Sequence, residues 1–236
     1  MRLLDGLFDA RISLAHADPR ADWPAVMPVE EASLQRAVEA RRREFRAGRT
    51  LARQAMLTLG SPPAPVAVQA DRSPAWPDGL VGNISHCDDL CIAAVGRIDH
   101  GWLAIGVDVE ARAELPPELV AEVCGREEQN WLAGLPARDR GVFARLIFSA
   151  KECAYKCQHT LSRRLLDFDA LTIRVDLATG QFVARFRQGV TPFAAGDELV
   201  GRYRMDTDHI VTAMALRREQ MAANAAGQQE SLRDHG

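Results

Sequence analysis

The chain has 236 residues, 47% of them hydrophobic, and its 29 Lys or Arg residues against 32 Asp or Glu residues give a net charge of −3. This composition predicts one large or two small globular domains and argues against a general affinity for nucleic acids or membranes. No apolar run reaches the roughly 18 residues of a membrane span, and five cysteines, an odd number, suit reduced thiols. Two cysteine pairs lack the tighter spacing of zinc ribbons, so no zinc site is expected of Cys87 with Cys91 or Cys153 with Cys157. We expect a cytoplasmic monomer with no nucleic-acid or membrane partner.

The first predicted element is a helix over 31–59, in which apolar residues such as Val38 recur at helical spacing until Gly60 ends it. Five prolines argue against any regular element between 61 and 79. The other predicted elements are short strands over 80–84 and 90–95, a strand over 102–110, a helix over about 139–157, and two hairpins that pair 171–177 with 181–187 and 201–206 with 209–216. The segment 219–236 is polar and rich in Ala and Gln, so we expect a disordered tail.

The strand over 103–110 separates its side chains onto two faces. Period-two alternation places Asp108 and Glu110 on the face of Gly106, and the apolar residues between them on the other face. Two neighbouring carboxylates repel each other unless a cation lies between them, and hard oxygen ligands suit a Mg²⁺ ion that holds a phosphate. The alternative is a solvated strand end, against which the glycine argues because it would let a ligand approach closely.

The second predicted helix carries the only two lysines of the chain, Lys151 and Lys156, whereas the other 27 of the 29 basic residues are arginines. An ammonium is compact and can titrate near a buried site, so the pair is a candidate for chemistry. Glu152 and Lys156 lie on one polar stripe, from which both could reach the same ligand. Two alternatives remain open. The helix could be exposed with a simple Glu152–Lys156 pair, or a capping box could start a helix at Ser149, although the apolar period upstream disfavours the second.

The first predicted helix carries a basic stripe, formed by Arg42, Arg46, Arg49 and Arg53. Such a stripe suits phosphate groups, but an ordinary solvated helix face has the same pattern. His86 could donate to phosphate oxygens beside the Ser85 hydroxyl, although a lone histidine is more often a satisfied structural donor.

Five segments, in their joint order and spacing, resemble a known family. They are Glu44-Phe45-x-x-Gly48-Arg49-x-x-Ala52-Arg53, Trp76-Pro77-x-Gly79, Ser85-His86, Gly106-Val107-Asp108-Val109-Glu110 and Phe148-Ser149-Ala150-Lys151-Glu152-x-x-x-Lys156. They look like the signatures of the 4'-phosphopantetheinyl transferases of the enterobactin and surfactin type, and they extend from about residue 41 to 168. The resemblance implies an α+β fold in which two similar α/β subdomains, 1–102 and 103–218, are related by a pseudo-twofold axis.

The resemblance also implies ligands and site residues. Coenzyme A and Mg²⁺, with Mn²⁺ able to substitute, would bind between the halves, and a serine of an apo acyl or peptidyl carrier protein would be the acceptor. The metal ligands would be Asp108, Glu110 and Glu152, and the catalytic residues Asp108, Glu152 and Lys156. The residues that bind coenzyme A would be Arg41, Arg49, Arg72, Ser85, His86, Asp108, Lys151 and Lys156.

The residues that would make two of these contacts are not decided by the sequence. For the 3'-phosphate, the motif favours Arg41 as the partner of Arg49, whereas the helical wheel favours Arg42. The loop over 68–74 would line the adenine, and Arg72 would replace a lysine that related enzymes often carry early in this loop.

The expected reaction transfers 4'-phosphopantetheine to the carrier serine and releases 3',5'-ADP, in siderophore or other secondary-metabolite biosynthesis. Glu152, directly or through water, or a neutral Lys156 would remove the serine proton. Arg163 and Arg164 are expected to face the acidic surface of the carrier. The alternatives are a metal-dependent phosphodiesterase or nuclease, which the net charge disfavours, and a non-catalytic coenzyme A binding protein, which would not need a full set of metal ligands.

Overall fold

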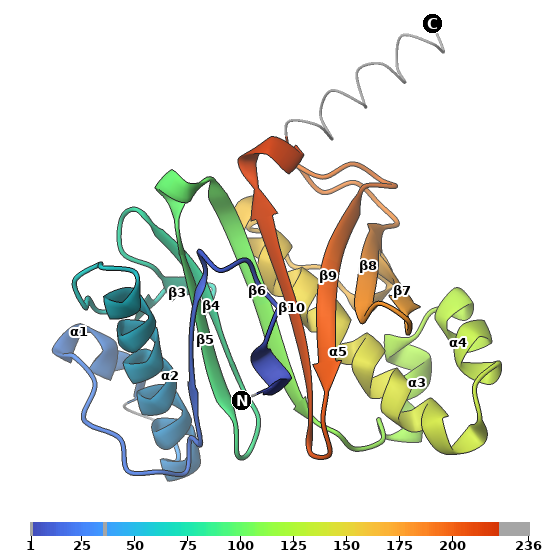
Figure 1. Ribbon diagram of the computed structural model, residues 1–236, viewed down its shortest axis with the longest axis horizontal. Coiled ribbons are helices and arrows are strands. Elements are labelled where there is room, and N and C mark those ends of the chain that lie inside the picture. Colours follow the sequence, from blue (N-terminus) through green and yellow to red (C-terminus); the bar gives the residue numbers. More distant parts are fainter. Residues whose placement is uncertain (1, 35–36, 222–236) are drawn as a thin grey trace, which may run out of the picture.

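The computed structural model describes residues 2–34 and 37–221 and shows helices packed on antiparallel sheets (Figure 1), which confirms the expected α+β class. The helices are α1 (Pro28–Glu31), α2 (Glu39–Thr58), α3 (Pro117–Val123), α4 (Arg126–Ala133) and α5 (Ala137–Ser162). The strands are β1 (Ser13–Ala17), β2 (Ala67–Val68), β3 (Pro74–Ala75), β4 (Leu80–His86), β5 (Cys91–Arg97), β6 (Trp102–Ala111), β7 (Leu171–Asp176), β8 (Gln181–Phe186), β9 (Glu198–Met205) and β10 (His209–Arg217). Within the described ranges, no helix is long and apolar enough to cross a membrane.

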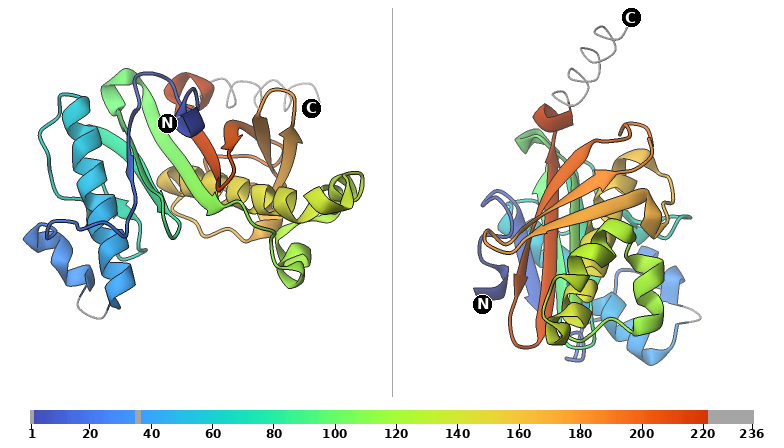
Figure 2. Two further views of the ribbon diagram at one scale, coloured as in Figure 1. Left: turned by 60° about the horizontal axis from the view of Figure 1, so that its bottom comes forward. Right: turned by 90° about the vertical axis from the view of Figure 1, so that its right-hand side faces the viewer.

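The first sheet has the strand order β1-β5-β4, and both of its pairings are antiparallel. Helix α2 packs on one face of this sheet, as the views in Figure 2 show. Gly48 makes the close packing possible, because a Cβ atom at this position would lie 2.8 Å from the side chain of Ile84 on β4. Arg49, the next residue of α2, lines the same cavity as residues of β4.

The second sheet has the order β6-β10-β9-β8-β7, and α5 packs against β6 and β10. Gly106 of β6 lies against the carbonyl of Cys153 on α5, so a side chain at position 106 would collide with the helix backbone. Asp108 and Glu110 share this face with Gly106, as predicted, since both contact side chains of α5. Ile105 packs on the opposite face, in a core shared with the first sheet.

The two halves of the chain meet where β4 packs along β6. Behind this contact, one hydrophobic core combines Val81 and Ile92 of the first sheet with Val107 and Val211 of the second. Burying these side chains together fixes how the two sheets sit against each other. The predicted division at 102/103 falls at the first residue of β6, and both this division and the pseudo-twofold relation stay predictions.

Some predicted boundaries are wrong. The helix predicted over 31–59 begins only at Glu39, because the residues up to Leu34 form α1 and a short 3-10 helix. Val38, predicted on the apolar face, is 72% exposed. The helix predicted over about 139–157 is longer at both ends. The predicted strands and hairpins are present, with small shifts at their ends.

Other elements are absent from the sequence-based prediction. Strand β1 and helices α3 and α4 were not predicted, and the proline-rich loop does contain a regular element, since β2 pairs with β3. Pro74 is tolerated there because a two-residue edge pairing does not need its missing N–H. Residues 218–221 are helical, and the rest of the predicted disordered tail, 222–236, lies outside the described residues.

Candidate active site

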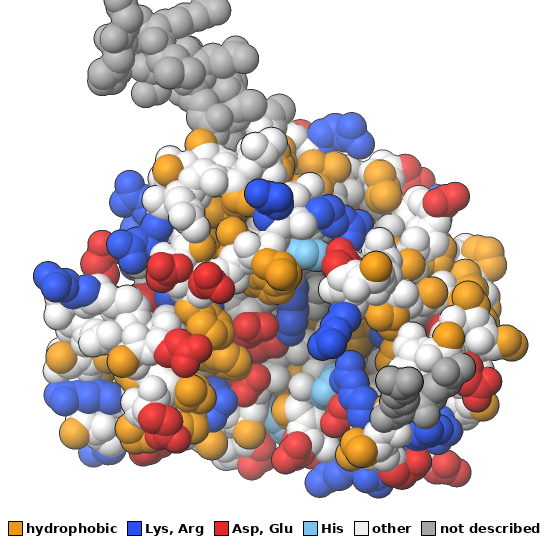
Figure 3. Space-filling view, turned by 180° about the vertical axis from the view of Figure 1, so that it is seen from behind, with side chains coloured by type: hydrophobic (Ala, Val, Ile, Leu, Met, Phe, Trp, Pro, Cys, Tyr) orange, Lys and Arg blue, Asp and Glu red, His pale blue; other side chains and the backbone are white. Residues whose placement is uncertain are grey.

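A cleft of about 1150 Å³ lies between α2, β4, the loop over 68–76 and the C-terminal part of α5. The view from behind in Figure 3 shows a hollowed face on which Lys, Arg and His side chains gather. The predicted site residues that line the cleft are Arg41, Arg49, Arg72, His86 and Lys156. The fold thus brings together at one cleft residues that the sequence places more than a hundred positions apart.

Asp108 and Lys156 form an ion pair that joins β6 to α5. Lys156 Nζ donates to Asp108 Oδ1 over 2.6 Å. The Ser85 hydroxyl donates to the same oxygen at 3.0 Å and accepts from Lys156 Nζ at 3.2 Å. Burial alone would lower the pKa of Lys156, but the charge of Asp108 and the hydrogen bond to it outweigh burial and raise this pKa. Lys156 is therefore an ammonium at neutral pH, which favours Glu152 of the two candidate bases.

Glu110 and Glu152 lie close enough to this pair to respond to its charges. Arg145 Nη1 donates to Glu110 Oε2 over 3.1 Å. Burial, followed by the charge of Asp108, raises the pKa of Glu110 to about 7. Burial also raises the pKa of Glu152, against the opposing effect of Lys156. The three carboxylates thus share a region where ionising all of them is costly without a cation.

The predicted metal ligands suit Mg²⁺ by their chemistry. Asp108 Oδ2 is buried and has no hydrogen-bond partner among the described residues. A hard cation is a natural partner for such an oxygen when two further carboxylates are near. In the described part of the chain, the carboxylate oxygens of Asp108, Glu110 and Glu152 do not all lie within 4.8 Å of one another. Asp108 is instead paired with Lys156, and Glu110 with Arg145. The residue types and the unpaired oxygen therefore fit the ion.

Arg49 is fixed in the wall of the cleft and is only 7% exposed. Its Nε donates to the carbonyl of Val66 over 2.6 Å, and its guanidinium carbon lies 4.1 Å from the centre of the Phe45 ring. Burial lowers the pKa of Arg49 to about 10, which leaves it charged at neutral pH. Its Nη1 and Nη2 have no partner among the described residues, so they are available to an anion in the cleft.

The structure distinguishes Arg41 from Arg42. Arg41 Nη1 lies 2.7 Å from His86 Nε2 and 3.2 Å from Glu44 Oε2, at the edge of the cleft. Arg42 Nε instead donates to the carbonyl of Ala37, outside the cleft lining. Burial lowers the pKa of His86, and a neutral ring can accept the hydrogen bond from Arg41. The geometry therefore favours Arg41, as the motif does, over the choice made from the helical wheel.

The predicted basic stripe on α2 is not one continuous phosphate surface. Arg53 turns to the fully buried Glu30, whose Oε2 lies 3.0 Å from its Nη1. Glu30 Oε1 also accepts from the backbone N–H of Val66, so it holds the segment to which Arg49 bonds. Glu30 was not predicted to have a role, because a single acidic residue outside any motif carries no signal of burial.

The structure corrects the assignment of Lys151 to coenzyme A. Its side chain is 2% exposed, and its Nζ pairs with Glu128 Oε2 at 2.9 Å. The same Nζ donates to the carbonyls of Val123 and Phe168, each at 2.8 Å. These partners use all three N–H donors of an ammonium, so none is left for a coenzyme. Lys151 thus joins α5 to the segments around it, and its side chain also lines a smaller cavity beside Glu152.

The loop over 68–74 lines the cleft, as expected, and contacts the C-terminal end of α5. Arg163 Nη1 donates to Ser73 Oγ over 3.1 Å and lies 3.6 Å from Asp71 Oδ2. His159 Nε2 lies 3.9 Å from the same Asp71 oxygen. Arg163 therefore contacts the loop while its side chain stays 50% exposed, and its role in meeting a carrier stays a prediction.

Comparison with known proteins identifies the family. Residues 29–96 match the model of the 4'-phosphopantetheinyl transferase N-terminal domain, and residues 104–212 match that of the 4'-phosphopantetheinyl transferase superfamily. The chain is 38% identical over 215 residues to 4'-phosphopantetheinyl transferase Svp of Streptomyces mobaraensis, a match that covers 89% of this chain and 85% of Svp. The chain belongs to the 4'-phosphopantetheinyl transferase superfamily. It is also 35% identical over 214 residues to 4'-phosphopantetheinyl transferase PptT of Mycobacterium tuberculosis, covering 86% of this chain and 92% of PptT. Enterobactin synthase component D of Escherichia coli is 35% identical over 129 residues, or 53% of this chain and 58% of that protein.

These matches confirm the resemblance drawn from the motifs.

The transferase also has a second, smaller cavity next to the cleft residues of α5. This cavity, of about 450 Å³, is lined by Glu152, Tyr155 and Phe168 among others. Tyr155 lines both cavities, while Lys156 lines only the main cleft. The sequence analysis missed Tyr155 because the motif leaves the three positions between Glu152 and Lys156 unspecified.

Proposed function

We propose that this transferase moves 4'-phosphopantetheine from coenzyme A to a serine of an apo acyl or peptidyl carrier protein and releases 3',5'-ADP. The observation that carries the proposal is the position of the Lys156–Asp108 pair. Lys156 lines the cationic cleft, while Glu152, whose pKa responds to both charges, lines the second cavity. A coenzyme A diphosphate at this point would have its nucleotide in the cleft and its pantetheine arm directed to the second cavity.

The cations of the cleft match the phosphates of coenzyme A. Arg49 and Arg41 would bind the 3'-phosphate through charge-assisted hydrogen bonds, since Arg49 offers two free guanidinium nitrogens. His86 and Lys156, which line the same cleft, would contact the diphosphate. Arg72 would contribute further charge beside the adenine.

The metal proposal rests on Asp108, Glu110 and Glu152, with Asp108 Oδ2 as the oxygen that has no other partner among the described residues. When bound, Mg²⁺ or Mn²⁺ would neutralise charge on the transferring phosphoryl group and on the leaving 3',5'-ADP. Lys156 would add a positive charge at the same place, and Ser85 would hold Asp108 in position through its hydrogen bond.

Glu152 is the proposed base. Burial raises its pKa, which brings it closer to neutral pH and makes the carboxylate a better proton acceptor. The carrier serine gives its proton to Glu152 while its oxygen bonds to the phosphorus and the bond to 3',5'-ADP breaks. Lys156, held as an ammonium by Asp108, donates to phosphate oxygens throughout.

The test is to incubate the protein with coenzyme A, Mg²⁺ and apo-carriers from fatty-acid, polyketide, nonribosomal-peptide and siderophore systems. A transferase adds the mass of 4'-phosphopantetheine to at least one carrier and releases an equal amount of 3',5'-ADP. A carrier whose acceptor serine is replaced by alanine is the control. Release of free 4'-phosphopantetheine without carrier modification would favour the phosphodiesterase, and neither product would favour a coenzyme A binding protein.

The proposal places the enzyme in the cytoplasm. All five cysteines are free, and four of them are buried, as suits a reducing compartment. The monomeric state and the absence of a nucleic-acid partner stay predictions.

A further inference from the structure

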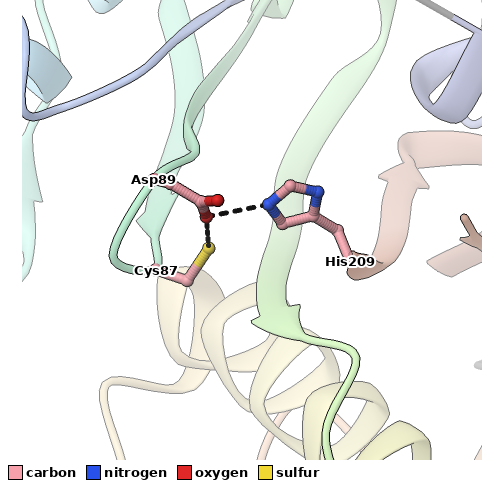
Figure 4. Close-up of side chains that lie close together, drawn as sticks. All are labelled: Cys87, Asp89 and His209. Atoms are coloured by element: carbon pink, nitrogen blue, oxygen red, sulfur yellow. Dashed lines mark hydrogen bonds and ion pairs between the residues drawn. The ribbon is translucent and has the colours of Figure 1, made fainter. Parts of the chain in front are cut away.

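Two hairpin turns, one from each half of the chain, bring three potential metal ligands together away from the cleft (Figure 4). The turn between β4 and β5 carries Cys87 and Asp89, and the start of β10 carries His209. His209 Nε2 lies 2.9 Å from Asp89 Oδ1, and Cys87 Sγ lies 3.5 Å from the same oxygen. Among the residues that the structure describes, this is the group whose ligand atoms all lie within 4.8 Å of one another.

Backbone hydrogen bonds fix both turns. The N–H of Cys87 donates to the carbonyl of Leu90 over 2.9 Å, which closes the first turn. In the second turn, the N–H of His209 donates to Asp206 Oδ1 over 2.7 Å. The three ligand side chains therefore start from backbone positions that are already set, so little ordering is required when a ligand binds.

We propose that Cys87, Asp89 and His209 form a binding site for a divalent transition-metal ion such as Zn²⁺. A thiolate, an imidazole and a carboxylate are the ligand types that such ions select, whereas Mg²⁺ prefers oxygen ligands alone. Tetrahedral geometry with ordinary zinc bond lengths requires about 3.3 Å between nitrogen and oxygen ligands and about 3.6 Å between sulfur and oxygen ligands. The sulfur–oxygen distance of 3.5 Å is close to the required value, whereas the nitrogen–oxygen distance of 2.9 Å is that of a hydrogen bond and would lengthen by about 0.4 Å around an ion.

The surroundings of His209 support the same site. Its other ring nitrogen, Nδ1, lies 3.7 Å from Asp206 Oδ1. In the metal-free protein, Nε2 donates its proton to Asp89 Oδ1 over 2.9 Å, and an entering ion would replace this proton, with the carboxylate of Asp206 near Nδ1 favouring the tautomer that binds the ion. Asp89 is 41% exposed on its side chain, which gives an ion a path from solvent, while His209 is 14% exposed.

Binding can be written without any further reactant. The ion displaces the proton of the Cys87 thiol, and bonds form to Cys87 Sγ, Asp89 Oδ1 and the unprotonated Nε2 of His209. Water completes the fourth position. Because the ligands come from two turns in different sheets, the bound ion would join the two halves on the side away from α5. This role is separate from the Mg²⁺ chemistry of the proposed function.

The test uses Co²⁺, whose thiolate bond gives a near-ultraviolet charge-transfer band. Titration of the full chain should show the band saturating at one Co²⁺ per chain, and Zn²⁺ should displace it. The conservative variants Cys87→Ser and His209→Gln should lose the band. Asp206→Asn keeps a side-chain oxygen that can accept from the N–H of His209 but removes the negative charge near Nδ1. This variant should keep the band but bind the ion about 10–100-fold more weakly.

Two control variants separate this site from others. Cys124→Ser removes a different buried thiol, and Asp108→Asn removes a proposed Mg²⁺ ligand, so both should retain the band. Zn²⁺ should raise the melting temperature of the wild type but not of Cys87→Ser, whose metal-free melting temperature shows whether it folds. The proposal is overturned if the wild type gives no charge-transfer band, or if the band survives in Cys87→Ser or in folded His209→Gln. None of these readouts depends on transfer activity.

Discussion

Lys156 Nζ lies 2.6 Å from Asp108 Oδ1, and this ion pair connects the strand of the predicted metal ligands to the helix of the proposed base. The lysine side chain is 25% exposed, towards the cleft, and the aspartate side chain is 5% exposed. Water reaches the pair through the cleft, which Lys156 lines and where the substrate would replace it. Substitution of either partner should affect catalysis more than stability.

Asp108→Asn should abolish transfer, because the amide keeps the shape of the side chain but loses the charge that holds Lys156 and a metal. The free energy of unfolding should fall by about 1–2 kcal/mol, less than the roughly 3–5 kcal/mol of a fully buried pair, since Lys156 is partly exposed. Carrier mass spectrometry and urea unfolding measure the two effects. Asp99→Asn, which breaks the exposed pair with Arg97, is the matched control. Wild-type turnover by Asp108→Asn at ordinary Mg²⁺ would remove the metal assignment.

Arg49→Ala should raise the KM for coenzyme A far more than the KM for dephospho-coenzyme A, since only the first carries the 3'-phosphate. A lost charge-assisted contact is worth about 1.5–3 kcal/mol, or roughly a 10- to 150-fold change in KM. Arg42→Ala, whose guanidinium faces the Ala37 carbonyl outside the cleft, should change neither value. An equal rise for both donors would show that Arg49 supports the wall of the cleft without contacting that phosphate.

The two lysines should separate stability from catalysis. Lys151→Met leaves the buried Glu128 with hydrogen bonds from the N–H groups of Gly125 and Ile173 but without a cation, so the free energy of unfolding should fall by about 3–5 kcal/mol. In the fraction that remains folded, kcat should stay close to that of the wild type. Lys156→Met should show the reverse pattern, with a small loss of stability and a large loss of kcat. Denaturant titration of both variants, with single-carrier kinetics, checks this; a stable Lys151→Met with a raised KM for coenzyme A would restore the predicted binding role.

The placement of Lys156 beside Asp108 and the wrong assignment of Lys151 have a common physical reason. Asp108 could be assigned because alternation along a strand fixes which face a side chain occupies, and Lys156 because helical spacing places it with Glu152. These are local properties of the chain. Lys151 was assigned wrongly because its partner, Glu128, lies on α4, a helix that was not predicted. A contact across the fold has no local pattern.

The same reason applies to the fold and to the rest of the site. Apolar periodicity located α5 and the later strands, but it extended α2 through Val38, which is largely exposed. The arginines of α2 differ in their contacts because of distant carbonyls and carboxylates, such as Val66 for Arg49 and Glu30 for Arg53. A helical wheel contains none of these partners, so it treats the arginines as equivalent.

The affinity for Mg²⁺ should depend on pH through Glu110. Burial and the charge of Asp108 raise the pKa of Glu110 to about 7, so below this pH the carboxyl group is largely protonated and the ion must displace the proton. The apparent Mg²⁺ requirement should therefore rise as the pH falls below about 7 and should level off above it, by up to tenfold per pH unit for one proton. Glu110→Gln should need more Mg²⁺ but show a weaker pH dependence. A wild-type Mg²⁺ requirement that is constant from pH 6 to pH 8 would contradict this assignment.

Glu152→Gln tests which residue takes the serine proton. The amide keeps the size of the side chain but cannot accept a proton, so kcat should fall by about 10²–10⁴-fold. Part of this fall in kcat would follow from the loss of a metal ligand and part from the loss of the base. Saturating Mg²⁺ would recover only the part that is due to the metal ligand, so it separates the two causes. Lys156→Arg is the complementary variant. Since the charge of Asp108 keeps Lys156 an ammonium, a permanently charged arginine should retain more activity than Glu152→Gln. If Lys156→Arg is instead the slower enzyme at saturating Mg²⁺ and coenzyme A, then the base is Lys156 and the proposed role of Glu152 reduces to holding the metal.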